Sequence, residues 1–251
     1  MQVVIICGGK GSRLKKNYES TPKALIEFKQ KPNLHYQIDQ LKKNGINDFL
    51  FLTNHLNKKI TNFLKKINLK NYKILSDKHL FGTAGALIGA KKYLKKEFIV
   101  LYSDIFIEFD FKNFIKFSRK KNFDCVVVVQ ANSHPHDSDT VEYGRNNIIN
   151  KIIFKNSENK KINNSTASIF YFKKKAIKNI VFKKNSFKDI VTDILPLLIK
   201  KKHLYAYKTI EYLNDFGTQD RLSDVKYSLK KGNIKNLIFK NKKTAVFLGR
   251  D

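Results

Sequence analysis

Tryptophan is absent from this chain of 251 residues, and cysteine, arginine and long apolar runs are scarce. The two cysteines, Cys7 and Cys125, lie in or at the end of apolar runs, which favours buried, reduced thiols over a disulfide framework. No run approaches the roughly 18 apolar residues that a membrane-spanning helix needs. The apolar run 3–7 is too short for a signal peptide, and no basic segment precedes it. We therefore expect a soluble cytoplasmic protein with no membrane partner.

Arginine occurs at only five positions, and lysine supplies most of the formal net charge of +29. Proteins that read nucleic acids usually rely on arginine for bidentate contacts with phosphate and guanine. Lysine beside abundant asparagine, isoleucine and phenylalanine is typical of an AT-rich genome at neutral surface positions. We therefore expect no nucleic-acid partner, although a positive field of this size attracts anionic substrates.

Enough apolar material is present for a folded core, since hydrophobic residues make up 42% of the chain and come in blocks. Short runs that are apolar throughout alternate with amphipathic segments, which indicates a parallel sheet covered on both faces. We predict an α/β fold, a Rossmann-like three-layer sandwich with a mainly parallel mixed sheet. The expected strands are 3–7, 49–53, 72–75, 98–102, 125–130 and 168–172, and the expected helices are 34–43, 58–67, 84–94, 111–120, 187–201 and 218–231.

Three details complete the predicted organisation. Pro196 is expected to kink or split the helix 187–201. Residues 132–163 are polar and rich in asparagine, and we expect a small β-hairpin or lid insertion there. Neither a linker nor an internal repeat divides residues 1–232, so we predict one domain over that range and a C-terminal tail at 233–251.

A glycine-rich turn, Cys7-Gly8-Gly9-Lys10-Gly11-Ser12-Arg13-Leu14, follows the first expected strand directly. Its glycines permit positive φ angles and leave backbone N–H groups available for phosphate oxygens. The carboxyl end of a first parallel strand is also where α/β folds bind nucleotides. The turn is not a Walker A loop, because no Gly-Lys-[Ser/Thr] follows it. It is not a dinucleotide-binding fingerprint either, because Leu14 occupies the position of the third glycine. Taken alone, the segment is equally compatible with a plain tight turn.

A second segment, Thr21-Pro22-Lys23-Ala24-Leu25, begins eight residues after Arg13. Together the two segments resemble the signature of the sugar-phosphate nucleotidyltransferase family, Gly-Gly-x-Gly-[Ser/Thr]-Arg-Leu followed by Pro-Lys-[Ala/Pro]-[Leu/Met]. The resemblance implies that Arg13 and Lys23 neutralise charge on the phosphates of an NTP during catalysis. It also implies that the backbone of the glycine turn holds the nucleotide through Gly8, Gly9, Gly11 and Ser12.

The sequence Phe81-Gly82-Thr83-Ala84-Gly85-Ala86-Leu87 resembles the segment with which this family reads the base at the start of a helix. The resemblance implies nucleotide-binding roles for Gly82, Thr83 and Gly85. We also expect Thr83 to cap the helix. A helix of small residues packed on the sheet would have the same sequence.

Two carboxylates are candidate ligands for Mg²⁺. Asp104 follows the expected strand 98–102, where it would face the nucleotide crevice; an ordinary turn residue is the alternative. The segment 212–218 resembles the family's Trp-x-Asp-[Ile/Val]-Gly-Thr element, which implies that Asp215 is the second metal ligand, although Leu213 replaces the commoner tryptophan. Because Asp104 and Asp215 are over a hundred residues apart, their convergence is a strict prediction. Thr218 would cap the last helix.

The acceptor side of the family pattern is less regular in this chain. Asn164 is the best match for the asparagine of the strand Asn-[Ala/Gly]-Gly-x-Tyr-x-Phe, which implies contact with the sugar. Lys155 is the candidate for the lysine that grips the sugar phosphate. Asp193 with Pro196 resembles the family's Glu-Lys-Asp-x-x-Pro helix, but Val191 replaces the glutamate that meets sugar hydroxyls.

Two further segments are suggestive. His134-Pro135-His136-Asp137-Ser138-Asp139 resembles a loop of heptose-type nucleotidyltransferases and is a candidate acceptor loop; a metal site there lacks a fourth ligand. The tail residues 244–251 resemble the first strand of a haloacid-dehalogenase-type phosphatase, with Gly249 in place of the nucleophilic aspartate, so no phosphatase activity is expected.

The resemblance implies an enzyme that uses Mg²⁺ to form an NDP-sugar and pyrophosphate from an NTP and a sugar 1-phosphate. GTP and a heptose or mannose type of sugar are favoured, because the glycine and base-reading segments resemble those of mannose and heptose guanylyltransferases. Two alternatives stay open: a cytidylyltransferase that acts on a non-sugar phosphate such as phosphocholine, and a catalytically silent nucleotide-binding regulatory module. Whether the chain forms a homo-oligomer also stays open.

Overall fold

A computed structural model describes residues 1–9, 11, 13–14, 18–76, 81–119, 123–131, 138–155, 164–232 and 234. The parallel half of its main sheet centres on β1 (Gln2–Ile6), which lies between β4 (Asp48–Leu52) and β6 (Glu97–Tyr102). β5 (Tyr72–Leu75) extends the sheet beyond β4, also in parallel. The carboxyl ends of these strands therefore meet at one edge, which is where the glycine turn begins.

The other half of the sheet is mixed. The long strand β11 (Asn164–Lys173) runs antiparallel to β6 on one side and to β8 (Cys125–Ala131) on the other. β12 (Leu204–Lys208) adds to β8 in parallel. The hairpin of β9 (Thr140–Tyr143) and β10 (Ile149–Ile153) joins through the pairing of β9 with β11. The predicted mixed sheet is thus confirmed, and the predicted hairpin lies within residues 132–163.

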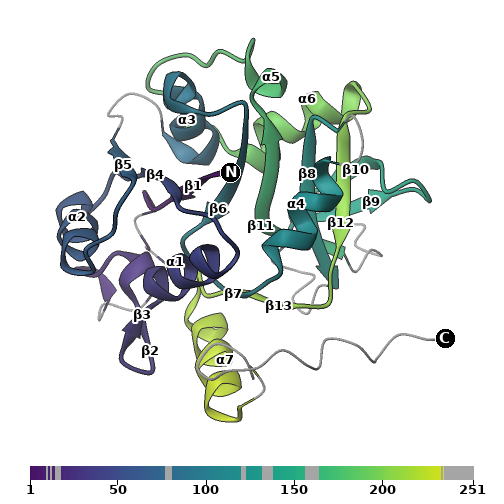
Figure 1. Ribbon diagram of the computed structural model, residues 1–251. Helices are drawn as coiled ribbons and strands as arrows, with labels where there is room; N and C mark the ends of the chain where they lie inside the picture. Colours follow the sequence, from purple (N-terminus) through teal and green to yellow (C-terminus); the bar gives the residue numbers. More distant parts are fainter. Residues whose placement is uncertain are drawn as a thin grey trace.

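Helices cover both faces of this sheet (Figure 1), which confirms the predicted three layers. Alternate residues of β1 enter different cores, Val3 and Ile5 on one face and Val4 on the other. Burial on both faces explains why the strands are apolar throughout. The first face carries α1 (Asn33–Lys43), α2 (Asn57–Lys66) and α4 (Phe111–Arg119), and the second carries α3 (Gly82–Gly89), α5 (Lys174–Ile177) and α6 (Leu195–Lys200).

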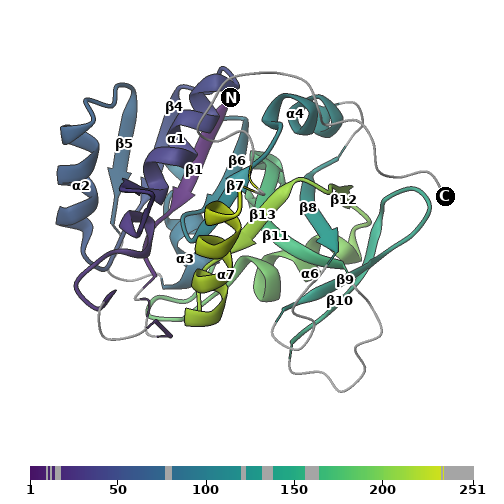
Figure 2. The same cartoon turned by 90° about the horizontal axis from the view of Figure 1, so that it is seen from below.

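A third, smaller core lies beside the main sheet and positions the last part of the described chain. The ribbon of β7 (Ile105–Glu108) and β13 (Tyr212–Asp215) leads into α7 (Gln219–Lys230), as Figure 2 shows. Phe28 makes edge-to-face contacts with Phe106 and Phe216, and their rings pack with apolar residues of α7. The short elements around it are η2 (Lys23–Leu25), β2 (Glu27–Phe28) and β3 (Lys31–Pro32).

The predicted helix 187–201 is wrong over its first part. Ile190–Ile194 forms a π-helical turn, and α6 begins at Leu195 with Pro196 in its first turn. Proline has no N–H and its ring excludes the carbonyl four residues before it, so a regular α-helix does not run from residue 190 into residue 196, and the break expected at Pro196 is confirmed. The predicted helix 84–94 is also shorter, because α3 ends at Gly89 and a 3₁₀ turn, η3 (Lys91–Tyr93), follows.

Both cysteines are free and buried, as predicted. Burial raises the pKa of the Cys7 thiol to about 12, so the thiol stays protonated and unreactive at neutral pH. None of the helices in the described ranges is long and apolar enough to cross a bilayer.

Candidate active site

The two predicted metal carboxylates meet at the β7–β13 ribbon. Asp104 lies in the turn between β6 and β7, and Asp215 is the last residue of β13. Asp215 is the register partner of Ile105, and the backbone N–H of Phe216 donates to the carbonyl of Asp104 at 2.9 Å. The pairing of β7 with β13 therefore brings together two residues that are far apart in the sequence.

The two predicted phosphate-binding cations converge on the same place. The ammonium of Lys23 lies 3.0 Å from the carboxylate of Asp104, and the Lys23 side chain is only 13% exposed. A methyl group at Gly217 would lie 3.4 Å from Nη2 of Arg13, 3.4 Å from Oδ1 of Asp215 and 3.5 Å from Nζ of Lys23. Two cations and two carboxylates therefore gather around Gly217. We call these four residues, Arg13, Lys23, Asp104 and Asp215, the charged cluster.

The glycine turn borders the charged cluster. Gly11 has a φ of +73°, and the Lys23 side chain passes 3.4 Å from the position where its Cβ would be. Gly8 packs against Asn54, while no described atom lies within 4 Å of a Cβ built at Gly9. The turn thus leaves room beside Gly9 for a ligand. Ser12 lies outside the described residues.

Two buried amides of α1 hold the turn that carries Asp104. Asn33 donates to the carbonyls of Ser103 and Ile105 at 2.9 and 3.0 Å. Gln37, one helical turn further on, donates to the carbonyls of Tyr102 and Ile105 at 2.9 and 2.8 Å. Both amides are fully buried, so these bonds are shielded from water and hold the position of the turn firmly. The sequence analysis did not identify this support.

Asp215 has two further partners from its own end of the chain. Its carboxylate accepts from the backbone N–H of Gly217 at 3.2 Å and forms an ion pair with Arg221 of α7. Thr218 caps α7 by accepting from the backbone N–H of Arg221, as predicted. The cap places Arg221 in the first turn of α7, directly beside Asp215.

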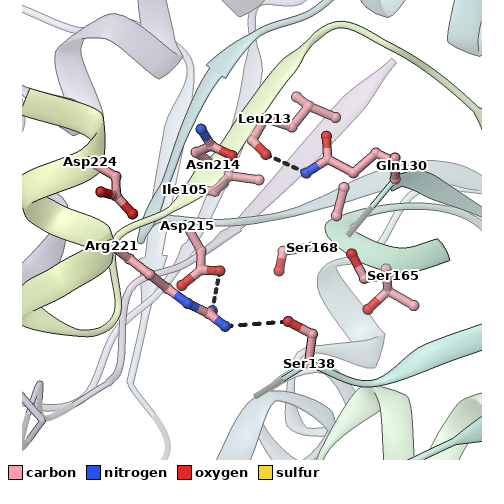
Figure 3. A pocket seen from close by; sticks show the side chains of 13 residues that line it. Ile105, Gln130, Ser138, Ser165, Ser168, Leu213, Asn214, Asp215, Arg221 and Asp224 are labelled. Carbon is pink, nitrogen blue, oxygen red and sulfur yellow. Dashed lines mark hydrogen bonds and ion pairs between the residues drawn. The ribbon is translucent and has the colours of Figure 1, made fainter. Parts of the chain in front are cut away.

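A cavity of about 240 Å³ opens beside Asp215 (Figure 3). The Arg221 guanidinium lies between the Asp215 carboxylate and the hydroxyl of Ser138, to which it donates at 3.3 Å. The wall is mostly small and polar. It is formed by Ile105, Gln130, Ala131, Ser138, Ser165, Thr166, Ala167, Ser168, Leu213, Asn214, Asp215, Arg221 and Asp224.

The segment predicted to read the base is held to the π-helical turn. Gly82 has a φ of +76°, and a Cβ there would lie 2.2 Å from the carbonyl oxygen of Lys188. The backbone N–H groups of Ala84 and Gly85 donate to that same oxygen. Only glycine fits at position 82, and the reason is this close approach of two backbone segments.

Thr83 does not cap α3, contrary to the prediction. The N-cap residue is Phe81, which makes no side-chain cap bond. The Thr83 hydroxyl donates to Asp189 at 2.7 Å and accepts from the backbone N–H of Ile190 at 2.9 Å. Thr83 therefore links α3 to the π-helical turn, and Asp189 is a partner that the sequence analysis missed.

Tyr102, at the end of β6, lies between this segment and the charged cluster. Burial raises the pKa of the Tyr102 hydroxyl well above its ordinary value, and the charges of Asp189 and Asp104 act in the same direction. Both carboxylates are thus close enough to Tyr102 to influence it. The segment predicted to read the base and the Asp104 carboxylate therefore border the same strand end.

None of the three predicted acceptor residues lines the cavity. Asn164 begins β11 opposite Ala131, one residue before the lining starts at Ser165. Lys155 is exposed after β10, and its backbone N–H donates to Asp139 at 2.9 Å. Asp193 accepts from the Lys188 ammonium at 2.9 Å and from the backbone N–H of Asp189 at 2.8 Å, so it stabilises the π-helical turn.

The candidate acceptor loop is described only at its end, because residues 132–137 lie outside the described ranges. Ser138 lines the cavity and contacts Arg221. Arg221 itself was missed by the sequence analysis. The available signal was its type: it is one of five arginines in a chain whose other cations are lysines.

The donor set fits a magnesium ion that arrives with a nucleotide. Among the described residues there is no group of three or more His, Cys, Asp or Glu side chains of the kind that holds a resident metal. Mg²⁺ is commonly bound through one or two carboxylates together with substrate phosphates and water. Asp104 and Asp215 beside the glycine turn match that smaller requirement.

Comparison with known proteins identifies the family of the chain. The family model described as nucleotidyl transferase matches residues 2–232. The chain is 32% identical over 247 residues to the bifunctional protein GlmU of Methanocaldococcus jannaschii. The aligned region covers 96% of this chain and 58% of GlmU. It is 29% identical over 227 residues to mannose-1-phosphate guanyltransferase 2 of Candida glabrata, and that alignment covers 86% of this chain and 61% of the relative. The chain thus spans about three fifths of the length of these curated relatives.

Solved structures share the fold. HddC from Yersinia pseudotuberculosis superposes with a TM-score of 0.76 at 22% identity, covering 91% of this chain and 99% of that one. A Bacillus anthracis protein assigned as a glucose-1-phosphate thymidylyltransferase gives a TM-score of 0.77 at 20% identity, covering 96% and 97%. These likenesses confirm the predicted α/β fold. From the family model, the relatives and the fold together, the chain belongs to the nucleotidyl transferase family.

Proposed function

We propose that this chain transfers a nucleotidyl group from an NTP, with GTP favoured, to a sugar 1-phosphate of mannose or heptose type. The observation that carries the proposal is the charged cluster, in which two cations and two carboxylates from four separate segments gather at the end of a parallel strand. Clusters of this kind suit a polyphosphate and a divalent cation together. NTPs and sugar phosphates are cytoplasmic metabolites, and we propose that the enzyme acts there.

In the proposed reaction an oxygen of the sugar 1-phosphate attacks the α-phosphorus of the NTP. A new P–O bond forms, the bond to the β-phosphate oxygen breaks, and pyrophosphate leaves. The attacking oxygen is already ionised, so no general base is required. Arg13 and Lys23 neutralise the charge that gathers on the α-phosphate and the leaving pyrophosphate. Losing either side chain is expected to cost roughly 10²–10³-fold in rate.

Asp104 and Asp215 are the residues we assign to Mg²⁺, which would offset the negative charge of the reacting phosphates when bound. The protein's own contribution is to hold these carboxylates. Asn33 and Gln37 fix the Asp104 turn, and the cap of α7 fixes the chain after Asp215. We propose that the glycine turn and the base-reading segment hold the nucleotide between them.

The preference for GTP is supported by the relatives. Mannose-1-phosphate guanyltransferases are among the similar proteins, and one solved structure of HddC contains GMP-PN. A mannose type of acceptor is supported by the names of the same relatives. The heptose type is proposed from the resemblance of the sequence motifs.

The acceptor strand supports a shifted alignment of the family motif. Ser168 has a φ of +57°, and the register of β11 changes between Thr166 and Phe170. A left-handed residue is where a glycine is favoured. If Ser168 stands at the motif's glycine, Thr166 takes the place of the motif's asparagine and Phe170 that of its tyrosine. We therefore propose that Thr166, which lines the cavity, contacts the sugar in place of Asn164.

A panel of substrates tests the proposed function. The purified chain is incubated with Mg²⁺, each of the four NTPs, and mannose 1-phosphate, a heptose 1-phosphate, phosphocholine or no acceptor. We expect pyrophosphate release, with a product of NDP-sugar mass, only when an NTP and a sugar 1-phosphate are both present. GTP is expected to react fastest.

Two outcomes of the panel would replace the proposal. Turnover of CTP with phosphocholine, and none with sugar phosphates, would identify a cytidylyltransferase of another acceptor class. Thermal stabilisation by an NTP without any pyrophosphate would identify a silent nucleotide-binding module.

A further inference from the structure

Arg221 occupies the boundary between the charged cluster and the acceptor cavity. Its side chain is 11% exposed, is paired with Asp215 on one side and contacts Ser138 on the other. Among the described residues that line the cavity, it is the one lysine or arginine. Its charge therefore lies within a wall otherwise made of hydroxyls, amides, carboxylates and small apolar groups.

The proposed reaction requires a cation at this boundary. The acceptor's phosphate must approach the α-phosphorus of the NTP, and both groups are negatively charged. Arg13 and Lys23 lie beside the glycine turn and are assigned to the NTP. Lys155, the residue predicted to hold the acceptor's phosphate, is exposed on the hairpin and does not line the cavity. Of the described residues, Arg221 is the cation of the cavity wall that is placed to meet the second phosphate.

We infer that Arg221 binds the phosphate group of the acceptor, an inference that rests on the proposed function. A guanidinium presents its N–H donors in a planar fork, which matches two phosphate oxygens at once. The cap of α7 fixes the Arg221 backbone, and Asp215 and Ser138 hold its guanidinium, so little freedom of the side chain is lost when a phosphate binds. The hydroxyl-rich wall beyond it then faces the sugar ring.

The same arrangement couples acceptor binding to Asp215. In the structure the guanidinium neutralises the carboxylate assigned to the metal. When a phosphate engages the guanidinium, the ion pair weakens and the Asp215 carboxylate becomes available to a divalent cation. Because such coupling is reciprocal, a divalent cation should also tighten the binding of the acceptor.

Binding and kinetics of two Arg221 variants test the inference. Isothermal titration calorimetry measures the affinity for the best acceptor of the panel, with mannose 1-phosphate tried first, and steady-state rates give KM for acceptor and NTP. Arg221→Met should weaken acceptor binding and raise its KM by roughly 10- to 100-fold, the effect of losing charge-assisted hydrogen bonds. The KM for GTP should change by no more than about 2-fold, because Arg13 and Lys23 remain.

Arg221→Lys keeps the charge but not the fork, so its acceptor affinity should fall between those of the wild type and Arg221→Met. This variant also serves where Arg221→Met fails to fold. Arg119→Met is the matched control, since Arg119 also pairs with a carboxylate, Glu97, but lies on α4 away from the cavity. It should leave both KM values unchanged.

Several results would overturn the inference. Arg221→Lys with unchanged acceptor affinity is one, and an equal rise in KM for GTP and acceptor is another. A loss of acceptor affinity in Lys155→Met but not in the Arg221 variants would return the role to Lys155. If the wild type releases no pyrophosphate with any acceptor, the proposed function fails, and that result is distinct from a normal enzyme with an indifferent Arg221.

Discussion

At the scale of single residues, Gly217 leaves open the space that the charged cluster surrounds. Side chains from three separate segments approach within about 3.5 Å of its missing Cβ. Two of these side chains, Arg13 and Lys23, are cations that the proposed function assigns to phosphate. The space beside Gly217 is therefore the space in which phosphate oxygens are expected to lie.

Gly217→Ala should accordingly impair the reaction without unfolding the chain. The added methyl would lie in ordinary van der Waals contact, 3.4 Å from Arg13 and Asp215, so these side chains need not move. It would instead occupy the space that we assign to the phosphate oxygens and displace the ligand. We expect kcat/KM to fall on the order of 10²-fold, as misplacement by about 1 Å can cause. Gly144→Ala, in the β9–β10 hairpin, is the control, because its Cβ would lie 3.6 Å from Asn150 alone. Normal rates in Gly217→Ala would show that phosphates do not bind at this point.

Motif spacing predicted the members of the charged cluster but not Arg221. Arg13, Lys23, Asp104 and Asp215 each stand in a short segment with a recognisable pattern. Arg221 stands in an ordinary amphipathic helix, and its position depends on a cap and on an ion pair that form only in the folded chain. Asn164 lies outside the cavity lining for another reason that appears only in the folded chain: the left-handed Ser168 and a change of register within β11 fall in a motif that the sequence presents without its glycine.

At the scale of elements, the start of α3 shows how one carbonyl can hold two segments together. The oxygen of Lys188 receives the N–H groups of Ala84 and Gly85, and Gly82 lets the two backbones approach. This contact positions the base-reading segment against the π-helical turn. The contribution of this contact to stability can be measured separately from the general cost of a left-handed backbone.

A pair of glycine variants makes that separation. Gly45 and Gly82 have nearly the same φ, +78° and +76°, but no described atom lies within 4 Å of a Cβ at Gly45. Gly45→Ala should lower the free energy of unfolding by about 1–2 kcal/mol, the cost of the left-handed conformation alone. Gly82→Ala should cost several kcal/mol, because its Cβ would overlap the Lys188 carbonyl. Equal losses, measured by urea denaturation, would contradict the close approach.

The elements that the sequence predicted are those with strong periodic or apolar signals. The four parallel strands and the helices α1, α2 and α4 lie within one or two residues of their predicted bounds. The strands β7, β12 and β13 were not predicted. They are short, and β12 and β13 end in polar residues, so their assignment depends on partners distant in sequence.

At the scale of the whole molecule, a buried carboxylate outside the site ties distant parts of the chain together. Asp124, just before β8, lies 2.8 Å from the Lys175 ammonium and 2.6 Å from Nδ1 of His203. Its carbonyl also accepts from the backbone N–H of Lys173. Burial alone raises the pKa of Asp124, but the bonds and charges of Lys175 and His203 outweigh burial and hold it below its ordinary value.

This carboxylate should make stability depend on pH on the acid side. Since the pKa is lower in the folded chain than in the unfolded chain, the stabilisation is complete above about pH 4 and disappears as the pH falls through the folded value. Asp124→Asn should cost about 1–3 kcal/mol at pH 7, the effect of losing hydrogen bonds to a charged group. The difference from the wild type should shrink below pH 4 in chemical denaturation. A difference that does not vary with pH would refute the assignment.

The central claim is that Asp104 and Asp215 together bind one divalent cation beside a nucleotide. Electron paramagnetic resonance with Mn²⁺ as the probe measures this directly, in the presence of a non-hydrolysable GTP analogue. The account predicts one tightly bound Mn²⁺ per wild-type chain, and its loss in both Asp104→Asn and Asp215→Asn while Asp39→Asn, on α1, keeps it. Equal Mn²⁺ binding by the wild type and by the Asp104 and Asp215 variants would contradict the account.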